Sequence, residues 1–474
     1  MPIDVSPLSF RDPMAQVVAV GGLIHRAVHL GHADAVEALL DQPWLQARMA
    51  RGDMPATHRC ERPAGAESWG DGWRWLRHDT LEFALHAHEI TSQQLHDAAL
   101  LTLDLAGEAL AAGYLLKDAS AWNVLHAEGR AVFVDLTSFV PHDGQSLWLA
   151  YGQFGRHFII PLLLARHLHL TPADVFVRHR DGMTPEMARR LLGRRRSFSS
   201  LAAMEFVGLP AMLRGAKPAA PSSGPAAASG VERAVQAQRA LLARLRGIVR
   251  SLEPARRERS TTWSGYTAQR DHYTEPGLAL KHEFLTRRLV AGQGRLLDLG
   301  CNTGEYALHA ARAGRPVVAA DIDEQSLHAL HAGRAGLPVS TWLLDLANPG
   351  PALGWRNAEV APTLQRARGR FGTVLCVGLL HHLLVTVRAP LANVMAFLAE
   401  LAPEELLIEW VPPQDRKFKE IAGPNLPLYE HLDAAAFETA LAPYWTVEER
   451  LPVPGNDRVL YALRRRALRE SMGA

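Results

Sequence analysis

The chain has 474 residues, 48% of them hydrophobic and 21% charged, so we expect a globular protein with two or three domains. Its formal net charge of +2 gives no reason to expect a nucleic acid as partner. Three scattered cysteines, Cys60, Cys301 and Cys376, exclude a disulfide framework or a zinc cluster and are typical of a reducing compartment. No secretory signal and no run of roughly 18 apolar residues is visible, which predicts a cytoplasmic protein with no membrane insertion and no metal site.

The N-terminal half contains a long amphipathic helix, predicted over residues 93–112, and then two aspartates and an asparagine at a characteristic spacing. Asp118 and Asn123 come first, and a short apolar strand at 132–134 then ends at Asp135. This spacing resembles the catalytic loop and the metal-binding aspartate of protein kinases and aminoglycoside phosphotransferases. In a working kinase, Asp118 would accept the hydroxyl proton, while Asn123 and Asp135 would hold magnesium.

Several features depart from the kinase pattern. Residues 1–116 contain no lysine, so the phosphate-pairing lysine is missing, although Arg26 could replace it. A G-x-G-x-x-G loop is absent, and Gly21 begins the nearest candidate, Gly-Gly. Leu116 stands where a histidine is common, and Leu136 with the following threonine replaces Phe-Gly. We therefore expect a kinase-like domain that binds without transferring phosphate; an active kinase and an unrelated α/β domain are the alternatives.

A stretch rich in Pro, Ala, Ser and Gly at 214–230 separates this mainly helical domain, residues 1–213, from the rest of the chain. Such a composition cannot bury enough apolar surface to order itself and predicts a flexible linker. Helical spacing with arginines on the other face, over 231–252, predicts a helix that leans on the domain rather than an RNA-binding helix. Aromatic residues and Lys281 complete a connector, 231–290, that suits a lid over a ligand or simple packing.

The most informative stretch is RLLDLGCNTG, residues 295–304. An apolar strand stops at Gly300, and Gly300 and Gly304 let the backbone turn sharply and approach a ligand closely. A helix and a second strand then deliver Asp321 at the position where doubly wound folds place a carboxylate beside ribose hydroxyls. The G-x-x-x-G spacing does not fit the dinucleotide fingerprint, so a pyrophosphate clamp is not expected.

Asp298 before the turn and Asn302 within it suit a ligand that carries an ammonium group and a ribose. The segment resembles the S-adenosylmethionine site of class I methyltransferases, D-x-G-x-G-x-G, with Asn302 in place of the central glycine. The resemblance implies S-adenosyl-L-methionine as cofactor, with its ribose on Asp321 and its adenine near Asp345 and Leu346. The expected cofactor-binding residues are Asp298, Gly300, Cys301, Asn302, Gly304, Asp321, Ile322, Asp345 and Leu346.

Strands and helices alternate through residues 291–466, the expected methyltransferase domain. Further strands are predicted at 339–344, 371–377 and 405–410, and a hairpin closes the series at 445–463. The resemblance implies a doubly wound, Rossmann-like sheet with the strand order 3-2-1-4-5-7-6. Ligands bind at the carboxyl ends of the strands in such sheets.

Three residues near these carboxyl ends are candidate catalytic groups: His381 and His382 after the fourth strand, and Glu409 in the fifth. Histidine suits proton removal near neutral pH, although one member of such a pair is usually structural. A base matters only if the methyl acceptor must lose a proton. Glu409 could bind the acceptor or form a salt bridge with an arginine.

Three segments, 345–355, 380–383 and 408–412, resemble a group of two-domain methyltransferases related to nodulation host-specificity proteins of the NoeA type. We therefore expect an S-adenosylmethionine-dependent methyltransferase that methylates oxygen on a glycan or small metabolite, with an N-terminal domain that recognises this acceptor. The alternatives are a bifunctional kinase–methyltransferase, an RNA or protein methyltransferase, and a binding module with a degenerate cofactor site. The sequence defines neither the acceptor nor the oligomeric state.

Overall fold

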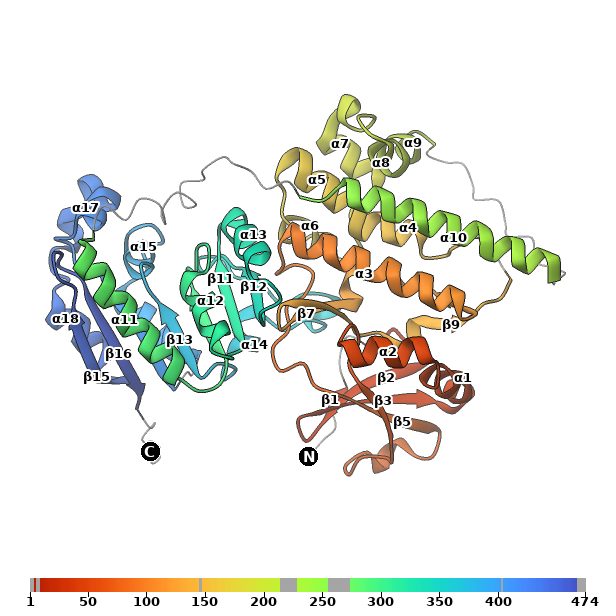
Figure 1. Cartoon of the computed structure of the whole chain (residues 1–474), viewed down its shortest axis with the longest axis horizontal. Coiled ribbons are helices and arrows are strands. Elements are labelled where there is room, and N and C mark those ends of the chain that lie inside the picture. The colour runs from red at the N-terminus through yellow and green to blue at the C-terminus, as the bar shows by residue number, and fades with distance from the viewer. Residues whose placement is uncertain are drawn as a thin grey trace. The chain divides into compact units, whose positions relative to one another are not determined.

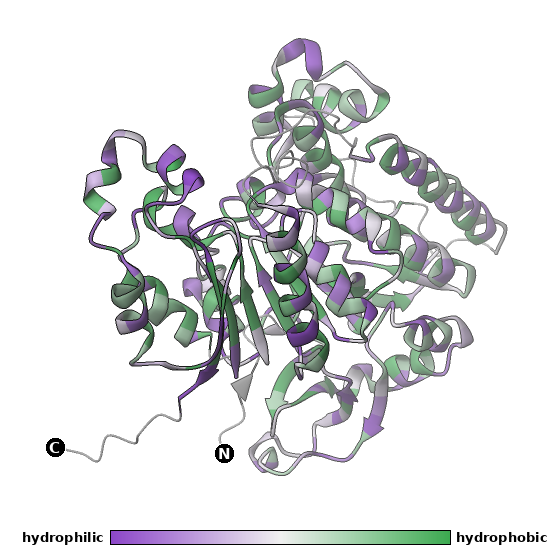
Figure 2. Ribbon diagram, turned by 60° about the vertical axis from the view of Figure 1, so that its left-hand side comes forward, coloured by the Kyte–Doolittle hydropathy of each residue, from purple (hydrophilic) through white to green (hydrophobic). Residues whose placement is uncertain are grey.

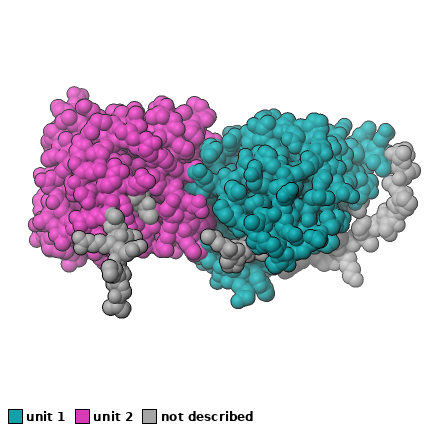
Figure 3. Space-filling model, turned by 90° about the horizontal axis from the view of Figure 1, so that it is seen from below, with its two compact units in different colours: residues 1–255, 351–361 teal, residues 256–350, 362–474 magenta. Residues whose placement is uncertain are grey.

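The structure is a computed structural model that describes residues 4–5, 9–144, 147–213, 228–254, 273–401 and 404–466. The chain divides into two compact units, shown in teal and magenta in Figure 3. The first unit comprises residues 1–255 and 351–361, and the second comprises 256–350 and 362–474. Within the described residues, no helix has the length and apolar character needed to cross a membrane.

The first unit begins with a five-stranded antiparallel sheet that the sequence did not predict. Its helices α1 (Leu30–Leu40) and α2 (Pro43–Arg51) follow the third strand, and Val18, Ala27 and Trp75 are buried in its core. The strands, in spatial order, are β1 (Asp4–Val5), β2 (Ala15–Val20), β3 (Leu23–His29), β5 (Trp73–His78) and β4 (Thr57–Cys60). The expected mainly helical character therefore holds only for the later part of this unit.

The later part of the first unit is built on α3 (Ser92–Ala111), the amphipathic helix that the sequence predicted. Thr91 caps this helix, and Gln94 completes a capping box that satisfies two of its free backbone amides. Two short ladders follow, β6 (Tyr114–Leu116) with β9 (Phe139–Pro141), and β7 (Val124–Ala127) with β8 (Arg130–Phe133). The remaining helices (Figure 1) are α4 (Tyr151–Phe154), α5 (Ile160–Leu168), α6 (Pro172–Phe176), α7 (Pro185–Arg196), α8 (Leu201–Ala203), α9 (Leu209–Met212) and α10 (Ala228–Ser251).

The helix expected over 231–252 is α10, and it packs against α3 of the first unit. Arg246 pairs with Asp104 of α3, and Arg244 pairs with Glu205. The following helix, α11 (Glu275–Ala291), belongs to the second unit. The structure therefore divides the expected connector, 231–290, between the two units.

The second unit is a seven-stranded sheet with five parallel strands and an antiparallel hairpin. Counted along this part of the chain, its spatial order reads 3-2-1-4-5-7-6, the order that the resemblance implies. In that spatial order the strands are β12 (Val339–Leu343), β11 (Val317–Asp321), β10 (Leu296–Leu299), β13 (Thr373–Cys376), β14 (Glu405–Trp410), β16 (Val459–Arg465) and β15 (Trp445–Pro452). Each strand predicted in this unit is present, with its ends shifted by no more than two residues.

Helices cover the sheet of the second unit, so its central parallel strands are buried along their whole length. Leu296, Leu375 and Leu407 are fully buried in the resulting core. The helices of the second unit are α11, α12 (Glu305–Arg312), α13 (Glu324–Gly333), α14 (Thr363–Ala367), α15 (Leu380–Val385), α16 (Leu391–Glu400), α17 (Arg416–Ala422) and α18 (Ala434–Leu441). The ends of the strands are therefore where polar side chains can gather.

The segment 351–361 leaves the second unit between β12 and β13 and belongs to the first. Its Glu359 side chain is 1% exposed and accepts from Arg11 Nη2 at 2.7 Å, and Arg180 also pairs with it. Two arginines compensate this buried carboxylate, which fixes the segment on the first unit. The predicted domain of 291–466 therefore lacks these eleven residues.

Candidate functional site

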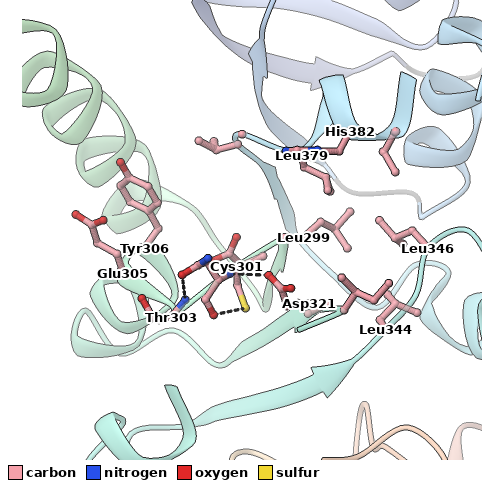
Figure 4. A pocket seen from close by; sticks show the side chains of 18 of the residues that line it. Leu299, Cys301, Thr303, Glu305, Tyr306, Asp321, Leu344, Leu346, Leu379 and His382 are labelled. Carbon is pink, nitrogen blue, oxygen red and sulfur yellow. Dashed lines mark hydrogen bonds between the residues drawn. The ribbon is translucent and has the colours of Figure 1, made fainter. Parts of the chain in front are cut away.

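A cavity opens at the carboxyl ends of β10, β11, β12 and β13 in the second unit (Figure 4). Its empty volume is about 1550 Å³, which includes space open to solvent. The predicted site residues that line it are Asp298, Gly300, Cys301, Asn302, Asp321, Ile322, Asp345, Leu346 and His382. Three predicted residues, Gly304, His381 and Glu409, do not line it.

Two glycines shape the turn after β10, for different reasons. Gly300 has φ +72°, and a Cβ there would lie 3.3 Å from the Leu379 side chain at the cavity wall. Gly304 has φ +79°, and a Cβ there would lie 2.3 Å from Leu330 Cδ1. Gly304 is therefore needed for the close packing of α12 against α13, whereas Gly300 lies at the cavity itself.

The carboxylate of Asp321 is held in one orientation at the end of β11. Its Oδ2 accepts from the backbone N–H of Asn302 at 2.7 Å, and its Oδ1 accepts from that of Asp323 at 2.9 Å. Burial raises the pKa of this carboxyl group. Figure 4 shows Asp321 pointing into the space bounded by Leu299 and Leu344. The backbone amides leave lone pairs of both oxygens for a ligand, since a carboxylate offers about four acceptor positions.

Asp298, at the end of β10, is almost completely buried at the base of the cavity. Burial, and then the negative charge of Asp321, raise its pKa to about 7. The same buried environment raises the pKa of the Cys301 thiol. Cys301 is therefore a small packing residue beside the turn, and Asp298 is a carboxyl group that a nearby cation would ionise.

Of the two histidines, only His382 lines the cavity. Burial, and then the charge of Arg458, lower its pKa to about 4, so its imidazole is neutral at physiological pH. His381 is fully buried, and its ring centroid lies 4.2 Å from that of His382. His381 thus packs behind its neighbour, while His382 faces the space that a ligand would fill.

Glu409 is the centre of a buried cluster of charges behind the cavity wall. Its side chain is 0% exposed, and its Oε1 accepts from Tyr273 Oη at 2.5 Å and from Lys281 Nζ at 2.8 Å. Lys281 Nζ and Arg458 Nη1 also donate to Tyr273 Oη, at 2.6 and 2.8 Å. Although burial acts to raise the pKa of Glu409, Lys281 and Arg458 hold it at about 2. The expected salt bridge of Glu409 is thus made chiefly with a lysine.

Tyr273 and Lys281 line the cavity. The sequence placed Lys281 and the neighbouring aromatic residues in a connector that suits a lid over a ligand, but not among the expected site residues. Tyr273 lies just before α11 and Lys281 lies within it, so both precede the strands of the sheet in the sequence. The signals that could have found them are the aromatic residues before the first strand and the rarity of lysine, since the chain has five lysines and 46 arginines.

In the first unit, Asp118 and Asp135 are near enough for their charges to interact. Burial, and then the charge of Asp135, raise the pKa of Asp118. The Asn123 amide lies 3.5 Å from the backbone oxygen of Asp118. Asp135 accepts from Arg26 Nη1 at 3.3 Å, from Thr137 Oγ1 at 3.0 Å and from Ser138 Oγ. Among the described residues, no group of three or more His, Cys, Asp or Glu side chains could hold a metal ion.

The second unit is thus a doubly wound α/β domain with a ligand-sized cavity at the carboxyl ends of its strands, where such folds bind their ligands. No family model matches the chain. The chain is similar to the nodulation protein NoeA of Rhizobium meliloti (strain 1021), with 28% identity over 463 residues. The alignment covers 96% of this chain and 95% of NoeA, so both units take part in the similarity.

Solved structures that are similar to part of the chain include those of two methyltransferases. The N-methyltransferase NodS of Bradyrhizobium japonicum WM9 is 16% identical, with a TM-score of 0.30, over 41% of this chain and 98% of NodS. The magnesium protoporphyrin IX methyltransferase ChlM of Synechocystis PCC 6803, solved with bound SAM, is 18% identical, with a TM-score of 0.28. That match covers 44% of this chain and 86% of ChlM. These likenesses are weak and add nothing to what the sheet order shows.

Proposed function

We propose that the second unit is an S-adenosylmethionine-dependent methyltransferase. The observation that carries this proposal is the fixed Asp321 carboxylate at the end of β11, beside the glycine turn after β10. When bound, the cofactor would supply a methyl group attached to a positively charged sulphur. The task of the chain is then to position this donor and the acceptor and to exclude water.

The cavity residues fit the parts of such a cofactor. Asp321 would accept hydrogen bonds from the ribose hydroxyls, because its oxygens are held by backbone amides and face the cavity. Ile322 is 58% exposed in the cavity wall, and with Leu346 it offers apolar surface to an adenine ring. Asp345 lies where it could accept from the adenine amino group.

Asp298 would face the ammonium group in the methionine part of the cofactor. Burial and the negative charge of Asp321 raise its pKa to about 7, so both penalise the carboxylate, and a cationic ligand would reverse this penalty. Asn302 has φ +50°, which turns its backbone amide toward Asp321 and keeps the turn open at the cavity. The methionine part would therefore lie against Asp298, Gly300, Cys301 and Asn302.

For the acceptor, we propose a hydroxyl group of a glycan or a small metabolite. His382 would take the hydroxyl proton on its imidazole as the acceptor oxygen attacks the methyl group, since this side chain lines the cavity. Glu409 is too acidic to take this proton, and with Lys281 it would hold Tyr273 at the cavity wall. His381 would act only by supporting the ring of His382.

We propose that the first unit is kinase-like in its Asp118, Asn123 and Asp135 motif and serves to recognise the acceptor. Arg26 occupies one oxygen of Asp135 and the backbone oxygen of Val134, so this carboxylate is engaged by the unit itself. A bifunctional kinase–methyltransferase is the second candidate, because Arg26 is a buried cation beside the Asp118–Asp135 pair and could replace the missing lysine.

Calorimetric titration of the full chain tests these proposals together. We expect S-adenosylhomocysteine to bind with one site per chain, and Mg-ATP to give no turnover. Absence of S-adenosylhomocysteine binding would overturn the methyltransferase proposal, while ATP turnover would favour the bifunctional candidate.

A further inference from the structure

The end of the first unit formed by α7, α8 and α9 combines dense positive charge with exposed apolar side chains. Helix α7 carries five arginines within eight residues, interrupted by Gly193, whose φ of 73° breaks the helix. In Figure 2 this end of the first unit, at the top of the view, carries both hydrophilic (purple) and hydrophobic (green) stretches of ribbon. The five arginines are Arg189, Arg190, Arg194, Arg195 and Arg196.

Within the described part of the chain, no ion pair includes any of these five arginines. Glu186 is the single acidic residue of α7, so the helix keeps a strong excess of positive charge. Glu205, in the following helical segment, is engaged by Arg244 and Tyr151 instead. The chain as a whole carries a net charge of only +2, so the positive charge here is a local feature.

Three of the five arginines, Arg189, Arg190 and Arg194, surround a hollow between α7 and α9. Its empty volume is about 600 Å³, including space open to solvent, and Glu186 and Ala211 complete its lining. A guanidinium group donates to phosphate oxygens in a planar, two-pronged geometry, and three of them around one hollow suit a phosphate group.

Large apolar side chains are exposed beside this hollow. Seven of the twenty exposed large hydrophobic residues of the described chain fall within residues 191–213. Leu209, Met212 and Leu213 are 44%, 60% and 67% exposed and flank Ala211 of the hollow. Leu191, 49% exposed, lies in the sequence between the hollow's arginines. Such a concentration marks a surface that is covered by a partner.

We propose that this end of the first unit docks on the surface of an anionic phospholipid bilayer. The arginines would bind headgroup phosphates, and the leucine and methionine side chains would enter the boundary between headgroups and acyl chains. A bilayer offers phosphates to the arginines and an apolar layer to the leucine and methionine side chains over the same small area. Its charged and apolar layers lie within a side chain's length of each other. This is attachment to a surface, and it needs no spanning helix.

Sedimentation of the full chain with vesicles tests this proposal. We expect binding to vesicles of phosphatidylcholine with about one third phosphatidylglycerol, and little binding to pure phosphatidylcholine. Each arginine near an anionic surface contributes roughly a fivefold increase in partitioning. The triple variant Arg189→Gln/Arg190→Gln/Arg194→Gln should therefore lose at least tenfold, and Met212→Asp/Leu213→Asp should lose binding at high salt as well as low salt.

A matched control removes three exposed arginines located elsewhere, Arg239→Gln/Arg250→Gln/Arg312→Gln, and should bind vesicles within about twofold of the wild type. Circular dichroism melting curves check that each variant is folded. Equal binding to anionic and neutral vesicles, or equal losses in the two triple variants, would overturn the proposal. Binding to soluble polyglutamate with no binding to vesicles would also overturn it and indicate an acidic protein partner.

Discussion

Two aspartates at strand ends, one in each unit, have the same chemistry and opposite surroundings. Asp321 of the second unit is held by two backbone amides and faces a cavity. Asp135 of the first unit is engaged by the side chains of Arg26, Thr137 and Ser138. Two backbone amides orient the carboxylate of Asp321 and leave acceptor positions on both oxygens, whereas a guanidinium and two hydroxyls contact that of Asp135. The two carboxylates therefore differ in their surroundings: that of Asp321 faces a cavity, and that of Asp135 is engaged by side chains of its own unit.

The largest effect is expected at the cavity of the second unit. His382→Ala should lower methyl transfer by roughly 10²–10⁴-fold, because a positioned general base contributes about that much. The affinity for S-adenosylhomocysteine should change little. Steady-state kinetics with the identified acceptor measures this, and His381→Ala is the control, with a smaller loss of turnover because its ring lies behind that of His382. Equal losses in both variants would contradict base catalysis by His382.

The second-largest effect is expected when the carboxylate of Asp321 is removed. Asp321→Ala should weaken S-adenosylhomocysteine binding by at least tenfold, since each hydrogen bond to a charged group contributes about 1.5–3 kcal/mol. Calorimetry measures the change, and Asp457→Ala, at an exposed turn between β15 and β16, serves as a carboxylate control. An unchanged affinity in the folded Asp321→Ala variant would remove the ribose-binding role.

The third effect is a pH dependence. The pKa of Asp298 is raised to about 7, so the free protein binds a proton there below that pH. A cationic ligand needs the carboxylate, and the proton must leave before it binds. The affinity for S-adenosylhomocysteine should therefore fall by about tenfold from pH 8 to pH 6. Asp298→Asn should flatten this profile, and a wild-type affinity independent of pH would show that Asp298 does not contact the charged part.

The smallest effect is expected at Asp135 of the first unit. ATP hydrolysis and phosphotransfer by the full chain should be at background, because positioning charges around the phosphates is nearly the whole of this catalysis. Asp135→Ala should leave S-adenosylhomocysteine affinity within about twofold. Phosphotransfer by the wild type that is lost in Asp135→Ala would contradict this prediction. Asp135 and Asp321 would then both belong to working sites.

The sequence predicted most of the second unit because its signals are local. Short apolar runs ending in glycine or aspartate identify β10 and β11, and they led directly to Asp298 and Asp321. The same stretch could not distinguish the roles of Gly300 and Gly304, since the neighbour of Gly304 is Leu330, which is distant in the sequence. Local sequence patterns thus identified the turn, whereas the roles of Gly300 and Gly304 in it depend on packing contacts.

Contacts between distant segments explain what the sequence did not reveal. Glu409 lies 128 residues from Lys281, and no spacing rule connects them. The strands of the first sheet were missed because polar residues interrupt their apolar pattern. His25 and Arg26 of β3 are buried there, and Arg26 is satisfied by Asp135, which is 109 residues away. A buried arginine in a strand can be understood only once its partner is known.

The state of the three thiols has a practical consequence. Cys376 is completely buried with its pKa raised to about 12, and Cys301 is buried at the wall of the cavity. Cys60, on β4, is half-buried, so a thiol-reactive dye should label the folded chain there first. Cys301 should react slowly, and only while the cavity is open. Its rate of alkylation would then report the residence of a ligand in the cavity, without any knowledge of the acceptor.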